Sequence, residues 1–191
     1  MPEMFDFVDR EGVPLFPHQA EMGDQFLADI SESGGEGTFT SFVFCNGGKT
    51  LAACYCMHLA KEHLGVSRFA VVSPGTIIRN QWPKEALHFG IQLSQEITSK
   101  RIAQQKVDKA LDGFSVTYQT VAKFPEVYRG WMHAEKSCVI FDEIHHLGSQ
   151  QTWGEACLSA FEFADIKICL TGTPFRSDNA IIPFLEYEKC D

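Results

Sequence analysis

The chain alternates between short apolar runs and longer segments with helical periodicity. Runs rich in β-branched and aromatic residues predict buried strands at 38–45, 68–73, 114–119, 137–142 and 167–172, with a weaker strand at 91–97. Apolar residues at helical spacing predict helices at 17–33, 48–65, about 76–88, 99–113 and 151–163. Strands that alternate with helices indicate an α/β domain with a mainly parallel sheet. The strands are apolar throughout, as expected when helices cover both faces of the sheet.

Length and composition indicate one globular domain. The chain has 191 residues, of which 45% are hydrophobic and 21% charged. Residues 1–14 lack a clear period and are expected to form an extended lead-in to a single domain over residues 15–191. The net charge of −9 argues against a broad electrostatic grip on nucleic acid, although a local groove remains compatible with it.

Cysteine usage and the amino terminus bear on the compartment. The seven cysteines form no CxxC pair and are expected to be reduced, as in a cytosolic protein. No apolar run reaches the length of a membrane span, and the acidic first residues are unlike a signal peptide.

The segment FCNGGKT follows a predicted strand and precedes a predicted helix. A phosphate-binding loop needs a tight turn at a helix N-terminus, followed by a Lys and a hydroxyl. Val43 and Asn46 depart from the general GxxxxGKT pattern, but Asn tolerates a positive φ. The alternative is a glycine turn with an incidental Lys49-Thr50 pair.

Asp142 and Glu143 follow a second apolar strand, in CVIFDEIHHLG. Such carboxylates can hold Mg²⁺ and polarise a water molecule. The intervening βα units would place Lys49 and Asp142 at the same edge of the sheet, where open α/β sheets bind their ligands. The alternative is an acidic helix cap. A zinc site is not expected, because the HExxH pattern and a third ligand are missing.

A third strand ends in Thr171-Gly172-Thr173. Taken in order, the three segments resemble the first RecA-like domain of a superfamily 2 helicase or translocase of the DEAD/DEAH-box type. FCNGGKT resembles motif I, FDEIH motif II and LTGTP motif III. The stretch TGTPFRSD, with WGEA upstream, is most similar to bacterial and phage helicases related to type III restriction translocating subunits. The resemblance spans about residues 14–185.

The resemblance implies a three-layer RecA-like P-loop domain with ATP and Mg²⁺ as cofactors. It assigns Lys49, Asp142 and Glu143 to catalysis, and Thr50 and Asp142 to Mg²⁺. The residues it assigns to the nucleotide are Gln19, Asn46, Gly47, Gly48, Lys49 and Thr50. Those it assigns to nucleic acid are Ser73, Gly75 and Thr76 in motif Ia and Thr117, Tyr118, Gln119 and Thr120 in motif Ib. Thr171, Gly172 and Thr173 would couple hydrolysis to movement, whereas Trp82 is expected only in the core.

In this family the ATP site lies between two RecA-like domains, and the second carries an arginine finger that this sequence lacks. The resemblance therefore implies an N-terminal motor domain of an ATP-dependent helicase or duplex translocase that hydrolyses ATP slowly on its own. Its expected partners are DNA rather than RNA and a second RecA-like domain in cis or in trans. The isolated domain is expected to be a monomer in bacterial or phage-infected host cytoplasm, without membrane contact. Two alternatives remain: a stand-alone binding module with a variant P-loop, and a different P-loop enzyme such as a small-molecule kinase.

Overall fold

The computed structural model describes residues 8–42, 47–104, 107–148, 151–172 and 184. Its centre is a six-stranded sheet in the order β3-β8-β7-β4-β6-β5, in which all pairs are parallel. The strands are β3 (Gly37–Phe42), β4 (Arg68–Ser73), β5 (Leu93–Ser94), β6 (Gly113–Thr117), β7 (Ser137–Asp142) and β8 (Ile166–Thr171). The predicted α/β class and parallel sheet are confirmed.

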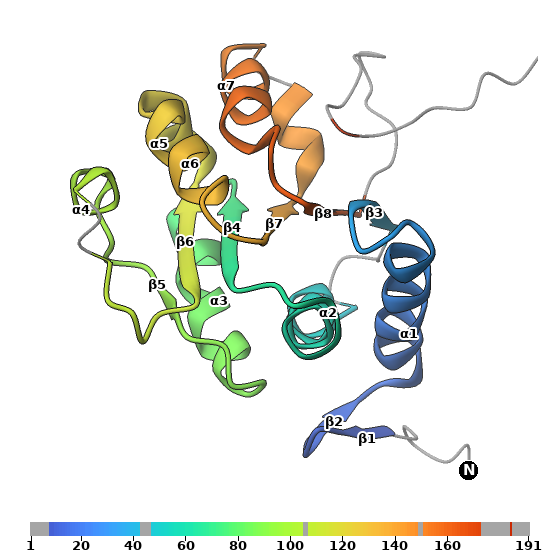
Figure 1. Cartoon of the computed structure of the whole chain (residues 1–191). Coiled ribbons are helices and arrows are strands. Elements are labelled where there is room, and N and C mark those ends of the chain that lie inside the picture. Colours follow the sequence, from blue (N-terminus) through green and yellow to red (C-terminus); the bar gives the residue numbers. More distant parts are fainter. Residues whose placement is uncertain (1–7, 43–46, 105–106, 149–150, 173–183, 185–191) are drawn as a thin grey trace, which may run out of the picture.

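Helices cover both faces of this sheet. They are α1 (Pro17–Glu32), α2 (Lys49–Leu64), α3 (Thr76–Leu87), α4 (Ser99–Ala103), α5 (Tyr118–Lys123), α6 (Pro125–Met132) and α7 (Gln151–Phe161), with a 3₁₀ turn at Ile144–Gly148. Figure 1 shows the sheet between α1, α2 and α3 on one side and α5, α6 and α7 on the other. The domain therefore has three layers.

Two hydrophobic cores lie on the two faces of the sheet. Side chains alternate along β7, so Cys138 and Ile140 join the core under α1–α3, while Val139 and Phe141 join the core under α5–α7. Each of these four side chains is fully buried. This explains why the strand sequences are apolar throughout rather than alternating.

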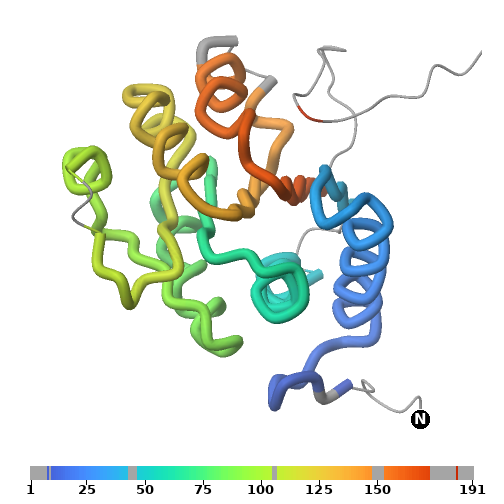
Figure 2. Tube along the Cα trace, in the orientation of Figure 1, coloured from blue at the N-terminus to red at the C-terminus, as the bar shows by residue number. Residues whose placement is uncertain are grey.

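The residues before α1 form a small hairpin. Strand β1 (Val8–Arg10) pairs antiparallel with β2 (Val13–Leu15), and Arg10 forms an ion pair of 3.0 Å with Asp24 of α1. The described part of the predicted lead-in is thus extended, but it is folded back on itself. Figure 2 shows this hairpin and α1 at the β3 side of the sheet, and α4 at the β5 side.

The predicted helix over 99–113 is wrong after Ala103 within the described residues. The Asp108 side chain accepts from the backbone N–H of Ala110 at 3.0 Å, a local turn that competes with helix formation. Asp112 then accepts from the backbone N–H of Gln92 at 2.8 Å, which ties the chain to the segment before β5.

Other elements also differ from prediction. The strand expected over 114–119 ends at Thr117, because the Thr117 side chain caps α5 by accepting from the Thr120 N–H at 3.3 Å. The weaker strand over 91–97 is reduced to β5, and α6 was not predicted. Among the described residues, no helix combines the length and the hydropathy needed to cross a membrane.

Candidate functional site

The candidate site lies at the carboxyl ends of the parallel strands. Asp142 is the last residue of β7, Thr171 ends β8 and Ser73 ends β4, while α2 begins with Lys49 after β3. Because the strands are parallel, these ends lie together along one side of the sheet, here called the carboxyl edge, where open α/β folds usually bind their ligands. The fold thus brings together segments that the sequence analysis singled out separately.

Gly48 gives the candidate phosphate loop its shape. It caps α2 with a φ of +70°, a left-handed conformation that suits glycine. A Cβ at this position would also collide with the Gln19 amide nitrogen. Lys49 and Thr50 follow in the first turn of α2, where backbone N–H groups are available to an anion. Asn46 lies outside the described residues.

Gln19 contacts the main chain of this loop. Its side chain is 2% exposed, accepts from the backbone N–H of Phe16 at 2.9 Å and donates to the Gly48 carbonyl at 3.1 Å. His18 Nε2 lies 3.0 Å from the carbonyl oxygen of Gly47. The residue that the resemblance assigned to adenine therefore contacts the main chain of the loop.

Lys49 and Glu143 form an ion pair across the site, between residues 94 positions apart in the chain. Glu143 has a φ of +52°, an uncommon conformation for a residue with a Cβ. Its other carboxylate oxygen accepts from the Gly172 N–H at 3.3 Å. Burial alone would raise the pKa of Glu143, but the hydrogen bond and charge of Lys49 hold it below its usual value.

His145 links motif II to the end of β8. Its Nδ1 lies 2.9 Å from the Thr171 hydroxyl and 3.4 Å from the Glu143 carboxylate. The Glu143 carboxylate thus has neighbours on α2, on the 3₁₀ turn and after β8. Thr173 lies outside the described residues.

Asp142 is 4% exposed and is held at two points. Its Oδ2 accepts from the Trp82 indole N–H at 3.0 Å, and its main-chain carbonyl accepts from the Tyr118 hydroxyl at 2.8 Å. Burial raises the pKa of Asp142, against the opposing effects of Trp82 and Lys49. Burial likewise raises the pKa of the Tyr118 phenol, so that it stays protonated and remains a donor.

The hydrogen bond from Trp82 to Asp142 was not predicted from the sequence. Trp82 was expected in the core, and its side chain is indeed fully buried. The available signal was general: a buried indole N–H usually finds an acceptor, although its partner cannot be identified from sequence.

The residues assigned to nucleic acid gather at the ends of two neighbouring strands. Ser73 and Thr117 are register partners in β4 and β6. The Ser73 hydroxyl is buried and has no hydrogen-bond partner among the described residues. Thr76 and Gln119 are exposed, and the backbone at Gly75 faces open space. The Tyr118 side chain is fully buried, so it does not reach this surface.

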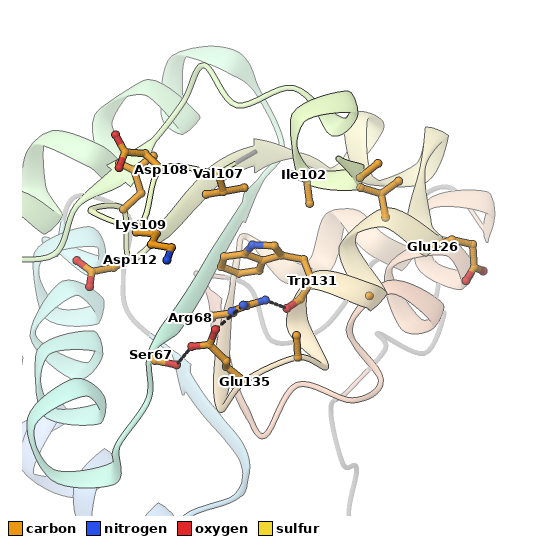
Figure 3. A pocket seen from close by; sticks show the side chains of 15 residues that line it. Ser67, Arg68, Ile102, Val107, Asp108, Lys109, Asp112, Glu126, Trp131 and Glu135 are labelled. Atoms are coloured by element: carbon orange, nitrogen blue, oxygen red, sulfur yellow. Dashed lines mark hydrogen bonds and ion pairs between the residues drawn. The ribbon is translucent and has the colours of Figure 1, made fainter. Parts of the chain in front are cut away.

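A cavity of about 880 Å³ lies at the opposite end of the strands, here called the amino edge (Figure 3). There the Arg68 guanidinium lies 4.8 Å from the Trp131 ring centroid, donates to the Trp131 carbonyl at 2.6 Å and pairs with Glu135 at 2.5 Å. The charge of Arg68 is thus compensated by Glu135. Lys109 also lines the cavity, but none of the residues that the resemblance assigned to the nucleotide does. Size alone therefore does not identify the site.

The donor set at the carboxyl edge fits Mg²⁺ rather than a metal held by protein alone. Thr50 and Asp142 could supply a hydroxyl and a carboxylate, the kinds of oxygen ligand that Mg²⁺ uses together with substrate phosphates. Within the described ranges, no three His, Cys, Asp or Glu side chains gather into a metal-binding group.

Comparison with known proteins agrees with this geometry. Residues 12–176 match the family described as the type III restriction enzyme, res subunit. "Uncharacterized protein Rv2917" of Mycobacterium tuberculosis is 36% identical over 137 residues, covering 70% of this chain and 22% of that protein. "Uncharacterized protein ML1624" of Mycobacterium leprae is 35% identical over 140 residues, covering 73% of this chain and 23% of that protein. The chain thus spans less than a quarter of the length of these relatives.

Two solved structures share the fold. The Sulfolobus solfataricus SWI2/SNF2 ATPase core in complex with dsDNA superposes with a TM-score of 0.62 at 18% identity, covering 83% of this chain and 32% of that chain. The UvsW helicase from bacteriophage T4 superposes with a TM-score of 0.59 at 16% identity, covering 93% and 59% respectively. The chain belongs to the family of the type III restriction enzyme res subunit and is homologous to the N-terminal RecA-like domain of superfamily 2 helicases.

Proposed function

We propose that this chain is the ATP-binding motor domain of an ATP-dependent DNA helicase or duplex translocase. The observation that carries the proposal is the meeting of Lys49 and Glu143 beside the buried Asp142, at the N-terminus of α2. A lysine at a helix N-terminus opposite acidic residues is the arrangement that P-loop NTPases use for phosphoryl transfer.

Each residue has a defined task in this proposal. Backbone N–H groups of Gly47, Gly48 and Lys49 bind phosphate oxygens, and the Lys49 ammonium exchanges Glu143 for the terminal phosphates. That exchange frees the Glu143 carboxylate to orient an attacking water. Thr50 and Asp142 would hold Mg²⁺, which neutralises phosphate charge when bound.

We also assign Gln19 to the adenine base. When adenine binds, Gln19 would change its contact with the phosphate loop. Its amide nitrogen donates to the Gly48 carbonyl in this structure. A side-chain amide has both a donor and an acceptor, so it can contact an adenine edge once it is released from the main chain.

DNA is the proposed nucleic acid because the Sulfolobus relative in fold is described as bound to dsDNA. Thr76, Thr117, Gln119, Thr120 and the backbone at Gly75 would contact its phosphates, the contacts that position a protein on a strand. Ser73 is fully buried, as is Tyr118, and is not proposed as a contact. A groove of about 620 Å³ continues from Thr120 along residues that include Arg79, Lys100 and Phe124. Thr171, Gly172 and Thr173 would transmit the state of Glu143, whose carboxylate accepts from the Gly172 N–H.

Efficient hydrolysis is proposed to need a second RecA-like domain. An arginine finger supplied by such a domain accelerates phosphoryl transfer by about 10³–10⁵. The curated relatives are more than four times longer than the matched region, which leaves room for that domain in cis.

Isothermal titration of the chain with Mg²⁺-ATP tests the nucleotide site. Wild type is expected to bind, and Lys49→Ala to lose binding. Lys61→Ala is the matched control, because Lys61 pairs with Asp112 at the opposite edge at 2.7 Å. Equal affinity of Lys49→Ala and Lys61→Ala would contradict the proposed site. Absence of binding by wild type at millimolar ATP would favour a non-motor binding module instead.

A further inference from the structure

We propose that Trp82 and Tyr118 are positioning residues that connect the two candidate DNA-binding segments to Asp142. Through them, DNA and Mg²⁺-ATP would each strengthen the binding of the other. This inference rests on the proposed function and names the side chains through which its two ligands communicate.

The first connection is the indole of Trp82. Its Nε1–H donates to Asp142 Oδ2 at 3.0 Å, and the two side chains are 0% and 4% exposed. A buried carboxylate that loses a donor is costly, so this bond fixes where one carboxylate oxygen lies. Trp82 belongs to α3, whose first turn contains Thr76 beside the capping residue Gly75. A displacement of that first turn therefore acts on the carboxylate of Asp142.

The second connection is the phenol of Tyr118. It donates to the main-chain carbonyl of Asp142 at 2.8 Å from a fully buried position. Tyr118 is the first residue of α5, between Thr117 and Thr120, whose hydroxyl oxygens lie 2.9 Å apart. A DNA phosphate that engages this threonine pair therefore acts one residue away from the Tyr118 backbone. The carboxylate and the carbonyl of Asp142 are thus held by different helices.

Helix α3 is anchored to strand β6 by a hydrogen bond near Pro83. Pro83 has no N–H, so the carbonyl of Arg79 lacks its usual helical donor four residues later. The hydroxyl of Ser115 on β6 donates to that carbonyl at 2.9 Å. Because β6 leads directly into α5, the helix that carries Trp82 and the helix that carries Tyr118 are tied to the same strand.

The consequence is a reciprocal coupling. If DNA raises the affinity for Mg²⁺-ATP by some factor, Mg²⁺-ATP must raise the affinity for DNA by the same factor. Removing either donor to Asp142 is expected to reduce both effects. Binding of ATP without Mg²⁺ is expected to change little, because Asp142 would act on the nucleotide through the metal.

The first test follows the indole N–H by two-dimensional NMR and needs no nucleotide. The chain has three tryptophans, so its spectrum contains three indole signals, and Trp82→Phe assigns one of them. That signal is expected to shift in Asp142→Ala and on addition of a short mixed-sequence duplex DNA. The Trp131 signal, from the opposite edge of the sheet (Figure 3), is expected to stay in place in Asp142→Ala. If the chemical shift of the Trp82 indole changed neither in Asp142→Ala nor on addition of DNA, the proposal would be overturned.

The second test measures Mg²⁺-ATP affinity by calorimetry with and without the same duplex. In wild type, DNA is expected to raise the affinity about fivefold or more, and in Trp82→Phe or Tyr118→Phe by less than about twofold. Trp131→Phe and Tyr128→Phe are the matched controls, since the Tyr128 hydroxyl contacts Ser99 at 3.1 Å instead. Tyr118→Phe removes one oxygen and keeps the ring, so it decides the matter even if Trp82→Phe does not fold.

The outcomes separate this inference from the proposed function. Wild type that binds Mg²⁺-ATP, with coupling unchanged in both variants, would overturn the positioning role and leave the nucleotide site standing. Wild type that binds no Mg²⁺-ATP would overturn both.

Discussion

Charged residues at the amino edge and at the carboxyl edge of the sheet differ in their partners and in their burial. At the amino edge, Arg68 pairs with Glu135 at 2.5 Å and Lys61 pairs with Asp112 at 2.7 Å, and both cations also donate to backbone carbonyls. At the carboxyl edge, Lys49 and Glu143 hold each other across the site, and Asp142 is buried beside them.

Backbone conformation and unpaired groups follow the same division. At the carboxyl edge Glu143, a residue with a Cβ, has a positive φ, whereas the positive φ values before β4 and β5 at the amino edge belong to Gly65 and Gly90. The buried hydroxyl of Ser73, also at the carboxyl edge, has no partner in the described residues. Strained backbone and unpaired buried groups persist where function requires them. The site is thus marked by the strained backbone of Glu143 and by buried polar groups, whereas the cations of the amino edge combine ion pairs with hydrogen bonds to backbone carbonyls.

Replacing the two glutamates tests this division with the largest expected effect. Glu143→Gln is expected to lower the single-turnover rate of ATP hydrolysis by about 10²–10⁴, the usual contribution of a positioned base. Glu135→Gln should leave that rate within about twofold, since Glu135 lies at the other edge. Phosphate release measured with protein in excess gives both rates. Similar rates in Glu143→Gln and Glu135→Gln would show that Glu143 does not act in ATP hydrolysis.

Two glycines with the same backbone conformation sharpen the comparison. Gly48 and Gly65 have φ of +70° and +71°, so alanine at either is expected to cost about 1–2 kcal/mol of unfolding free energy. Gly48→Ala should additionally displace Gln19 and weaken Mg²⁺-ATP binding, because its Cβ would collide with that amide. Gly65→Ala meets open space and should bind normally. Urea unfolding and calorimetry measure the two quantities, and equal nucleotide affinities would contradict the account.

A double-mutant cycle tests how α3 is anchored. Ser115→Ala is expected to destabilise the chain by about 1 kcal/mol, because the carbonyl of Arg79 loses its donor. In a Pro83→Ala background the new N–H can take that carbonyl, so Ser115→Ala should cost less. Urea unfolding of the four variants gives the coupling. Equal costs in both backgrounds would show that Pro83 does not create the need for Ser115.

The smallest expected effect concerns pH at the amino edge. Hydrogen bonds from Ser67 and Arg68, together with the charge of Arg68, lower the pKa of Glu135 in the folded state. A carboxylate with a lowered pKa stabilises the fold at pH values above its ordinary pKa of about 4.3. This contribution disappears as the pH falls through the lowered, folded-state pKa.

Wild type should therefore exceed Glu135→Gln in stability at neutral pH by less than about 1 kcal/mol, because the Glu135 side chain is exposed. The difference should vanish in acid, as measured by urea unfolding across a pH series. A difference that grows in acid would contradict this sign.

Local patterns in the sequence predicted the sheet and the edge at which the site lies. Strands β4 and β7 match their predicted ranges because they are short apolar runs with clear ends. Lys49, Asp142 and Thr171 could be placed at one edge because parallel strands share a direction.

What the sequence could not predict depends on contacts between distant segments. The bond from Trp82 to Asp142 spans 60 positions and that from Tyr118 spans 24, and no local pattern specifies either partner. The turn at Asp108 was missed because its helical composition is overridden by a side-chain hydrogen bond.

Hydrogen exchange with and without a Mg²⁺-bound, non-hydrolysable ATP analogue tests the central claim most directly. If the nucleotide binds at the carboxyl edge, exchange should slow in residues 47–52 and 140–144 and stay unchanged in 107–112 and 131–136, which border the amino-edge cavity. Protection confined to the cavity segments, or no protection at 47–52, would contradict the assignment of the nucleotide site.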